Sequence, residues 1–353
     1  MFRNWRQRIT LTDVVIWAIG LAILVVVVIG TIATLRSGKY ALETWFDLSM
    51  SGLALGGVYA LIALGYTLVY GVLKMINFAH SEVFMSGPFT AVFLAEALNR
   101  AGYFDSHPVL SLLLITLVSA LVSCAIAVLL ERIAYRPLRG APRLVPLITA
   151  IGASFFLQYA FRGLYGSGIR AYPNITALEG FWSIGGLRVF RTDVVIIVSA
   201  FIMMLVLYGI VQKTKMGKAM RAVSEDKQVA ALMGIDVDRV IVVTFALGGL
   251  SAGVAGVLYA LAFPVVNFYM GFIPGIKAFT AAVLGGIGNV PGAFVGAMVL
   301  GVMESLGPNL FLDGLGIPAA NQLKDLVAFV ILVFILIFRP TGILGERLAK
   351  AKA

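Results

Sequence analysis

The residues most capable of chemistry in this sequence are a few ionisable side chains within long apolar stretches. His80 and Glu82 open one such stretch, and Lys277 and Glu304 lie in another. A charge at the centre of a bilayer costs about 2.5–3.5 kcal/mol on insertion scales, so such residues usually face a cavity or a partner. His80 and Glu82 are two positions apart and do not share a helix face. Two interpretations stay open for them: a polar lining of a transport pathway, or solvated positions near the cytoplasmic surface.

For the second pair of ionisable residues we expect structural roles. Glu304 can pair within a helical bundle, and Lys277 can extend its long side chain outward to the membrane surface.

The chain lacks the residue sets that enzymes need. One cysteine and two histidines make a poor zinc inventory, and no metal site is predicted. There is no G-x-x-x-x-G-K-[ST] motif for a P-loop, and Gly286-x-Gly288 lacks the preceding strand and the third glycine of a dinucleotide loop. No nucleophile–base pair is visible either. We therefore predict no catalytic residues and no cofactor bound by this chain.

The composition points to a membrane protein. Of 353 residues, 60% are hydrophobic and only 12% are charged, whereas soluble domains average roughly 45–50% apolar and about 25% charged residues. A soluble enzyme and a disordered chain are both excluded, the latter because disordered chains are poor in apolar residues. The net charge of +10 is explained by Lys and Arg collecting in cytoplasmic loops, so nucleic-acid binding is not predicted.

Apolar runs long enough to cross a bilayer, which needs about 20 residues, define the fold class. The sequence predicts an all-α integral membrane protein with about ten transmembrane segments. A region at 276–312, interrupted at Gly285–Gly292, is interpreted as a short broken pair because Pro and Gly interrupt the helical ladder. The other predicted helices cover residues 14–35, 47–72, 77–98, 108–130, 144–165, 193–212, 240–263 and 323–338.

Loop charges set the predicted orientation and domain limits. Basic residues gather before residue 14, at 131–143, at 213–239 and in the tail, so these segments and both termini are expected in the cytoplasm. The run at 14–35 is longer than the apolar core of a signal peptide and is predicted to be a retained helix. We divide the chain into an extra N-terminal segment (1–44), a transmembrane domain (45–345) and a basic cytoplasmic tail (346–353).

A weak similarity between two segments of the chain predicts an inverted repeat. The segment at 86–92 resembles that at 290–295, and each follows an interruption that contains an asparagine, Asn77 or Asn289. Paired interrupted segments in two halves are typical of transporters, which bind their substrates at such breaks. The predicted pathway residues are Asn77, His80, Glu82, Gly288 and Asn289.

The polar loop at 213–239 contains a predicted short amphipathic helix. Ser224 is a suitable N-cap, Glu225 and Asp226 suit the helix dipole, and Gly234 suits the C′ position. The helix at 225–233 would carry Val229, Leu232 and Met233 on one side. Such a helix is suited to a groove in another protein, and a helix lying on the membrane surface is the alternative.

Six stretches in order give the chain a dense resemblance to a known family. It resembles the LivH-type permease subunit of branched-chain amino acid ABC importers, from about Gly52 to Gly345. The matching stretches are GGVYALIALGYT (56–67), MINFAH (75–80), ERIAYRP (131–137), MGKAMRA (216–222), AFTAAVLGGIG (278–288) and RPTGILG (339–345). The first 40 or so residues match less well.

The resemblance implies an inner-membrane subunit that works with partners. These would be a second related permease, two cytoplasmic P-loop ATPases that bind the ATP, and an extracytoplasmic substrate-binding protein. The family's coupling segment matches this sequence at Gly217, Arg221, Ala222, Glu225, Asp226 and Gly234. Reversing the charge at Arg221 or Glu225 is therefore expected to uncouple transport without unfolding the chain.

Two other functions stay open at this stage. A urea or short-amide permease would have a similar subunit, and an ATP-independent secondary transporter would also contain broken helices. The second alternative needs an ion-coupling group, for which Glu82 and Glu304 are the candidates. A pathway with few charges suits a neutral or zwitterionic solute with an apolar side chain, which favours Leu, Ile and Val.

Overall fold

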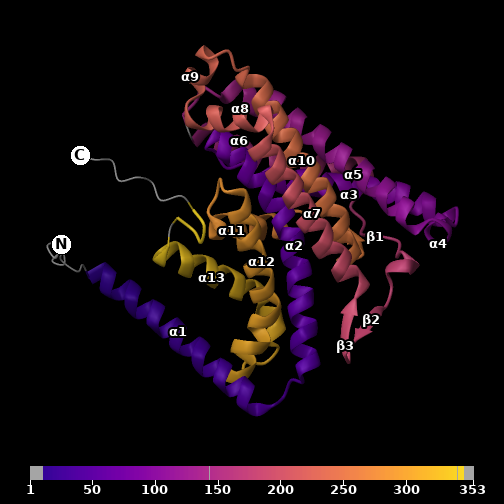
Figure 1. Cartoon of the computed structure of the whole chain (residues 1–353), viewed down its shortest axis with the longest axis vertical. Coiled ribbons are helices and arrows are strands. Elements are labelled where there is room, and N and C mark those ends of the chain that lie inside the picture. The colour runs from indigo at the N-terminus through magenta and orange to yellow at the C-terminus, as the bar shows by residue number, and fades with distance from the viewer. Residues whose placement is uncertain (1–10, 143, 340, 346–353) are drawn as a thin grey trace.

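A computed structural model describes residues 11–142, 144–339 and 341–345 (Figure 1). Helices make up most of it, as expected for the predicted fold class. The α-helices are α1 (Leu11–Ser37), α2 (Leu42–Leu73), α3 (His80–Arg100), α4 (Tyr103–Ser106), α5 (Pro108–Leu130), α6 (Leu144–Tyr165), α7 (Arg191–Lys213), α8 (Lys215–Glu225), α9 (Lys227–Leu232), α10 (Val237–Ala262), α11 (Phe272–Gly285), α12 (Val290–Gly307) and α13 (Lys324–Phe338).

Short turns and strands connect these helices. The π-turns are η1 (Glu131–Tyr135) and η4 (Pro308–Leu312), and the 3₁₀ turns are η2 (Arg136–Leu138), η3 (Thr176–Leu178), η5 (Asp313–Leu315) and η6 (Ala320–Leu323). Strand β1 (Arg170–Ala171) pairs antiparallel with β4 (Val265–Val266). Strands β2 (Phe181–Ile184) and β3 (Leu187–Phe190) form a hairpin with Phe181 opposite Phe190. Gly185 and Gly186 form its turn with positive φ at both positions, as a type I′ turn requires.

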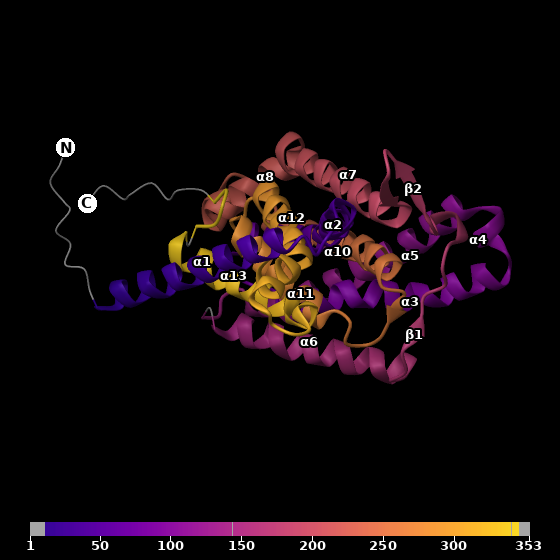
Figure 2. The same ribbon diagram turned by 90° about the horizontal axis from the view of Figure 1, so that it is seen from below.

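Helix α2 forms the centre of the bundle and runs through its middle (Figures 1 and 2). Helices α12, α10, α11 and α7 pack against it, and α3 and α5 pack against α10. By contrast, only a small share of the residues of α1, α13, α7, α6 and α5 is buried, and each of these helices has large apolar side chains on its outer side. Such apolar outer faces are suited to the hydrocarbon of a bilayer, which offers no partners to polar groups.

Eight helices are long and apolar enough to cross a membrane, judged by length and composition within the described residues. Each of these eight coincides with a segment predicted from the sequence. The predicted total of about ten is reached only if α3, which carries His80 and Glu82, and the shorter α11 also count. The number of spans and the location of the termini stay predictions.

The interruption expected at 285–292 is confirmed. Helix α11 ends at Gly285, Gly286 and Gly288 have positive φ, and Asn289 caps α12 by accepting the Gly292 N–H at 3.1 Å. The two similar segments, 86–92 and 290–295, do not occupy equivalent positions in their helices, however. Pro88 lies in the interior of α3, whereas Pro291 lies in the first turn of α12. The correspondence lies instead in the breaks, since α2 also ends at a residue with positive φ, Lys74.

Glycines allow the central helices to approach closely, because they carry no side chain at the contact. On α2, a Cβ at Gly52 or Gly56 would meet the backbone of α12 at 2.8 Å. On α10, a Cβ at Gly249 would meet Ser123 O and Ala127 Cβ of α5 at 2.7 Å, and Gly253 is as closely packed against α5. These close contacts hold α12 against α2 and α5 against α10.

Substitution of Gly301 by alanine should destabilise the bundle more than the same change at a lipid-facing glycine. A Cβ at Gly301 in α12 would overlap the backbone of Gly56 and Gly52, whereas Gly209 in α7 has no atom within 4 Å among the described residues. Overpacking of this kind costs about 1–3 kcal/mol. Thermal unfolding in detergent should show a lower midpoint for Gly301→Ala and an unchanged or higher one for Gly209→Ala. Equal midpoints would contradict the tight α2–α12 contact.

Candidate coupling site and pathway residues

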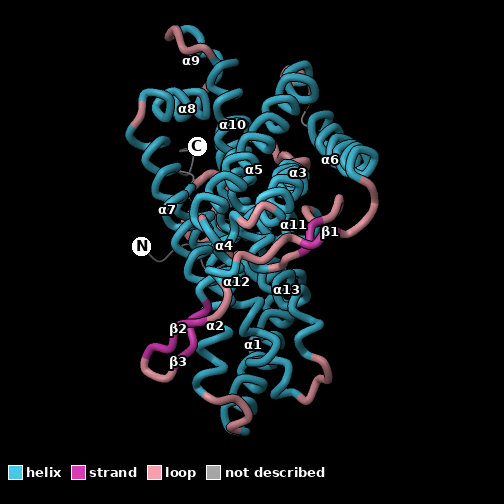
Figure 3. Tube along the Cα trace, turned by 90° about the vertical axis from the view of Figure 1, so that its right-hand side faces the viewer, coloured by secondary structure: helices cyan, strands magenta, loops and turns pink. Residues whose placement is uncertain are grey.

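Helices α8 and α9 form a separate layer at one end of the bundle (Figure 3). Thr214 caps α8 by accepting the Gly217 N–H at 3.0 Å. Gly217 itself is buried, and a Cβ there would collide with the Val211 carbonyl at the end of α7. The glycine is therefore needed because α8 folds back tightly on the helix that precedes it.

The Arg221 side chain is bonded to the end of α7 and holds the turn between α7 and α8 in place. Its Nη1 donates to the Val211 carbonyl and, at 3.2 Å, to Gln212 Oε1, so the guanidinium neutralises the carbonyl end of α7. The residue is half-buried, as is Ala222 beside it. Buried Met220 and Val223 then anchor α8 to the bundle.

The helix predicted at 225–233 begins later than expected, and Ser224 is not its N-cap. Ser224 lies in the last turn of α8, where its hydroxyl donates to the Arg221 carbonyl at 2.7 Å. The chain becomes extended at Asp226, whose Oδ1 accepts the N–H groups of Gln228 (2.8 Å) and Val229 (3.0 Å) and caps α9. A carboxylate that accepts two amide hydrogens at the positive end of a helix is a strong cap.

Gly234 ends α9 as predicted. Its φ is +80°, and the Ile235 N–H donates to the Ala230 carbonyl at 3.1 Å, which is the six-to-one bond of a Schellman motif. Helix α9 is thus a short helix that is capped at both ends. Ala230 lies on the inner side of α9 and is buried.

The outer face of α9 displays apolar side chains. Val229, Leu232 and Met233 are 54%, 86% and 78% exposed, and Glu225 and Asp226 next to them are also exposed. The three apolar residues share one side, as the sequence predicted. Exposure of three neighbouring apolar side chains to water is unfavourable. A patch of this kind is typical of a surface that contacts another molecule.

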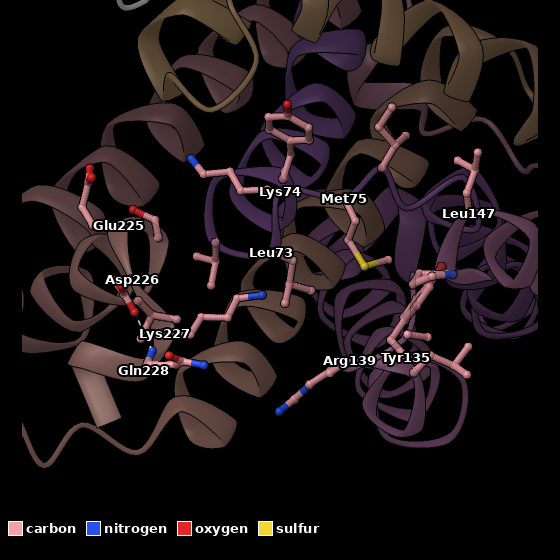
Figure 4. A pocket seen from close by; sticks show the side chains of 18 of the residues that line it. Leu73, Lys74, Met75, Tyr135, Arg139, Leu147, Glu225, Asp226, Lys227 and Gln228 are labelled. Atoms are coloured by element: carbon pink, nitrogen blue, oxygen red, sulfur yellow. Dashed lines mark hydrogen bonds between the residues drawn. The ribbon is translucent and has the colours of Figure 1, made fainter. Parts of the chain in front are cut away.

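Behind this layer lies a cavity of about 700 Å³ (Figure 4). Its one wall consists of residues 223–228, which include Glu225 and Asp226, and its other wall carries Lys74, Met75 and Tyr135. The cavity thus separates the coupling loop from the break between α2 and α3.

A charged cluster built around Arg139, which lines the cavity, holds α5 to α10. Arg139 binds both Glu131, which is fully buried at the end of α5, and Asp238 in the first turn of α10. Arg136 also binds Asp238. Burial and the repulsion of Arg139 lower the pKa of Lys227 on α9. Sequence reasoning counted these arginines only as loop charges and missed the cluster.

The residues of the α2–α3 break are buried and face different neighbours. Asn77 Oδ1 accepts the Tyr135 hydroxyl at 2.5 Å. His80 is packed edge-on against Tyr66, with ring centroids 4.9 Å apart, and its imidazole occupies the space left by Gly65 of α2. Because His80 is 1% exposed and Glu82 is inaccessible, the structure disagrees with one of the two interpretations left open for them, namely that both are solvated near the cytoplasmic surface.

Glu82 is held by neutral donors, two from α6 and one from the neighbouring residue in α3. Its Oε1 accepts hydrogen bonds from Gln158 (2.7 Å), Ser154 (3.2 Å) and Ser81 (3.3 Å). No cation pairs with it among the described residues. The geometry fits a buried polar position between α3 and α6, and a role in the pathway stays a prediction.

Gly288 and Asn289 belong to a different contact. Gly288 lies beside Gly71 of α2, and the Asn289 amide donates to the Leu344 carbonyl at 2.9 Å. Asn289 therefore fixes both the start of α12 and the C-terminal segment. Of the predicted pathway residues, only Asn77, His80 and Glu82 lie in one local segment.

Comparison with known proteins shows the family to which the chain belongs. The family described as "Branched-chain amino acid transport system / permease component" matches residues 48–336. The chain belongs to this family. It is 44% identical over 300 residues to the high-affinity branched-chain amino acid transport permease protein BraD of Pseudomonas aeruginosa, covering 84% of this chain and 94% of BraD. No solved structure matches the chain.

Two further relatives agree with this assignment. The high-affinity branched-chain amino acid transport permease protein LivH of Salmonella typhimurium is 42% identical over 312 residues, with 87% of this chain and 96% of the relative covered. LivH of Escherichia coli K12 is 41% identical over 313 residues, with the same coverage. The chain is thus a multi-pass inner-membrane permease, and α1 lies outside the part that the family matches.

The permease also contains an ion cluster that sequence reasoning misjudged. Lys277 does not extend outward to the membrane surface, because it is 3% exposed and its Nζ lies 2.6 Å from both Glu304 Oε1 and Asp325 Oδ1. The prediction that Glu304 pairs within the bundle is confirmed. The cluster joins α11, α12 and α13, and only the fold could reveal it because its members are widely separated in the chain.

We expect the replacement of Arg221 to impair transport because it disturbs the turn between α7 and α8. Arg221→Gln removes the charge that holds the Val211 carbonyl, so α8 and α9 should shift together, whereas Glu225→Gln changes an exposed charge at the end of α8. Limited proteolysis of the loop in membranes should be faster for Arg221→Gln and unchanged for Glu225→Gln. Equal proteolysis of both variants would show that Arg221 does not position the loop.

Proposed function

We propose that the chain is the permease subunit of an ATP-driven importer that moves branched-chain amino acids across the inner membrane. The observation that carries this proposal is the capped helix α9 with its exposed apolar side chains at the end of the bundle, with a cavity between it and the α2–α3 break. The high identity to BraD and LivH supports the substrate class. These relatives favour this function over a urea permease or a secondary transporter.

The proposed assembly contains four kinds of subunit. Two cytoplasmic P-loop ATPases bind and hydrolyse ATP, and one of them receives α9 in a surface groove. A second, related permease completes the membrane part, and an extracytoplasmic binding protein delivers the amino acid. This division of labour is consistent with the absence of a P-loop motif from the sequence.

The coupling residues have distinct proposed roles. Gly217, Arg221 and Ala222 set the angle between α7 and α8, while Asp226 and Gly234 cap α9. Glu225, which is exposed, faces the ATPase. When ATP binding draws the ATPases together, α9 moves toward the bundle and the change reaches Asn77, His80 and Glu82 across the cavity. Such a switch requires contacts that differ between two states.

ATP-dependent uptake tests the proposal. The chain, purified with its partners and reconstituted in proteoliposomes, should import radiolabelled leucine only with the binding protein and with ATP on the ATPase side. A protonophore should leave uptake unchanged at constant ATP, and excess urea should not compete. Uptake that continues without ATP and stops with the protonophore would instead establish a secondary transporter.

A further inference from the structure

The segment between α6 and α7 crosses the end of the bundle away from α8 and α9 (Figure 1). We call residues 166–178 the outer strap, because the predicted orientation places them on the extracytoplasmic side. Strand β1 of the outer strap pairs with β4, which lies between α10 and α11. Near the other end of the strap, the Thr176 hydroxyl donates to Asp105 Oδ1 of α4 at 2.9 Å. The outer strap therefore joins segments from both halves of the chain.

The links between the outer strap and its neighbours are weak. Strands β1 and β4 pair over two residues each, and so short a pair of strands is at most marginally stable. The ion pair between Arg170 and Glu96 of α3 spans 3.5 Å, and its side chains are 33% and 28% exposed. The Arg170 guanidinium also lies over the partly exposed ring of Phe93, 4.5 Å from its centroid. Contacts of this kind in reach of water stabilise little, so β1 can separate from β4 at low cost.

Glu96 keeps a partner when Arg170 leaves. Its Oε2 lies 3.6 Å from Arg100, one helical turn further along α3, while its Oε1 faces Arg170. Separation of the outer strap therefore leaves no unpaired carboxylate on α3. Arg170, which is already one-third exposed, passes into water, where its charge is well solvated.

Tyr172 both anchors the outer strap and opposes its closure. The residue is 4% exposed and belongs to the apolar core, and its N–H donates to the Pro264 carbonyl at 3.0 Å. Its hydroxyl is buried and has no hydrogen-bond partner among the described residues. Buried tyrosine hydroxyls usually have a partner, and a buried donor without one is unfavourable. Burial of the ring therefore favours a closed outer strap, whereas the hydroxyl favours an open one, in which it meets water.

We propose that the outer strap is a lid on the extracytoplasmic end of the permease, closed in this structure and opened in each transport cycle by separation of β1 from β4. A switch of this kind needs contacts that differ between its two states. The short strand pair, the shared Glu96 and the Tyr172 hydroxyl supply them. The inference rests on the proposed function and adds a moving part on the side from which the binding protein delivers the amino acid.

A disulfide between β1 and β4 tests whether the outer strap must open. In a Cys124→Ala background, Ala171→Cys and Val265→Cys replace two residues that lie opposite each other. Facing residues of antiparallel strands have Cα atoms about 4.5–5.5 Å apart, which suits a disulfide. Oxidation of the assembled complex in proteoliposomes should abolish leucine uptake, and dithiothreitol should restore it. Undiminished uptake with the disulfide fully formed would overturn the proposal.

The β2–β3 hairpin provides the matched control. Trp182→Cys and Val189→Cys face each other there in the same way, and their disulfide should leave uptake unchanged because it joins the hairpin only to itself. Equal loss of uptake in both oxidised variants would overturn the proposal, since the loss would then not depend on the outer strap. Counting the thiols that remain after oxidation gives the cross-linked fraction. If the first pair does not oxidise, Arg170→Cys with Val266→Cys locks the same two strands.

Labelling of single cysteines tests opening without a cross-link. Val266 is inaccessible at the β1–β4 contact, whereas its neighbour Val265 is 41% exposed. A membrane-impermeant maleimide on the extracytoplasmic side should label Val266→Cys several-fold faster during turnover, with binding protein, leucine and ATP, than at rest. Val265→Cys should react at the same rate in both conditions. If position 266 stays unreactive while uptake proceeds, the outer strap does not open and the proposal is overturned.

Two substitutions of Tyr172 should shift the lid in opposite directions. In the Val266→Cys background, Tyr172→Phe keeps the ring and removes the unpartnered hydroxyl, so labelling at position 266 during turnover should become slower. Tyr172→Ala removes the anchoring ring, so position 266 should react even at rest. Equal labelling in both variants and their parent would overturn the role assigned to Tyr172 in the balance between the two states.

The failure of the lid and the failure of the proposed function have different signatures. Leucine uptake by the wild-type complex, measured in the same preparation, reports on the function. Normal uptake by the cross-linked variant overturns the lid alone. Faster labelling of position 266 with binding protein and leucine, in a complex that shows no ATP-dependent uptake, overturns the importer and leaves the lid standing.

Discussion

Substitution of both Leu232 and Met233 by aspartate will separate this permease from its ATPases and abolish leucine uptake. Both side chains are more than three-quarters exposed (86% and 78%) and stabilise nothing within the chain. Each apolar side chain of this size contributes about 1.5–3 kcal/mol when it is fully buried in a partner. The loss of two such contacts exceeds the 1.4 kcal/mol that corresponds to about tenfold in affinity, before the cost of burying two carboxylates is added.

Co-purification and uptake measure this effect together. The double variant should appear in the membrane at the wild-type level, with a loss of more than about tenfold in bound ATPase and a matching loss of uptake. Ala231→Asp is the matched control, since Ala231 is exposed on the same helix but lies away from the apolar side. The control should retain ATPase and uptake. A double variant that keeps its ATPases would show that α9 is not the docking surface.

The helical framework could be predicted almost completely because its signal is local. Helices α5 and α6 have the predicted bounds, Pro108–Leu130 and Leu144–Tyr165, since each apolar run is bordered by Pro, Arg or a polar turn. The broken pair α11–α12 was also predicted, because clustered glycines at 285–288 favour a break in the helix and Pro291 is tolerated in the first turn of the helix that follows. Where two caps competed, at Ser224 and Asp226, the sequence alone favoured the wrong one.

The chemistry of the sites could not be predicted to the same extent, because it depends on contacts between distant segments. Glu82 was a candidate from its place in an apolar run, but its donors Gln158 and Ser154 lie in α6. Lys277 and Glu304 were each recognised as unusual, yet the prediction for Lys277 failed because Asp325 and Glu304 come close only in the folded bundle. Hydropathy reports how apolar a segment is and says nothing about which helix it meets.

Replacement of Arg139 by glutamine will destabilise the permease strongly. Arg139 is the cation that pairs with Glu131, whose side chain is fully buried, and it also binds Asp238. Removing one partner of a buried ion pair leaves an uncompensated charge and costs about 3–5 kcal/mol. The free energy of unfolding, measured by denaturant titration in detergent, should fall by that amount. The packing of α5 against α10 should loosen first.

The Arg136→Gln variant provides the matched control for the same acidic partner. Its pair with Asp238 is about half exposed on both sides (48% and 47%), and exposed pairs contribute only about 0–1 kcal/mol. The difference between the two variants therefore isolates the effect of burial. Equal losses for Arg136→Gln and Arg139→Gln would contradict the assignment of Glu131 as the buried partner.

A second substitution tests the cause of the Arg139 effect. If the loss arises from the unpaired Glu131 carboxylate, then Glu131→Gln in the Arg139→Gln background should restore most of the stability, because a neutral amide is far cheaper to bury than a carboxylate. Persistent instability of the double variant would mean that Arg139 acts mainly through Asp238. Since Arg139 lines the cavity behind α8–α9, the rescued variant also tests whether the charge of Arg139, rather than the stability of the bundle, is needed for coupling. Its leucine uptake at wild-type stability gives the answer directly.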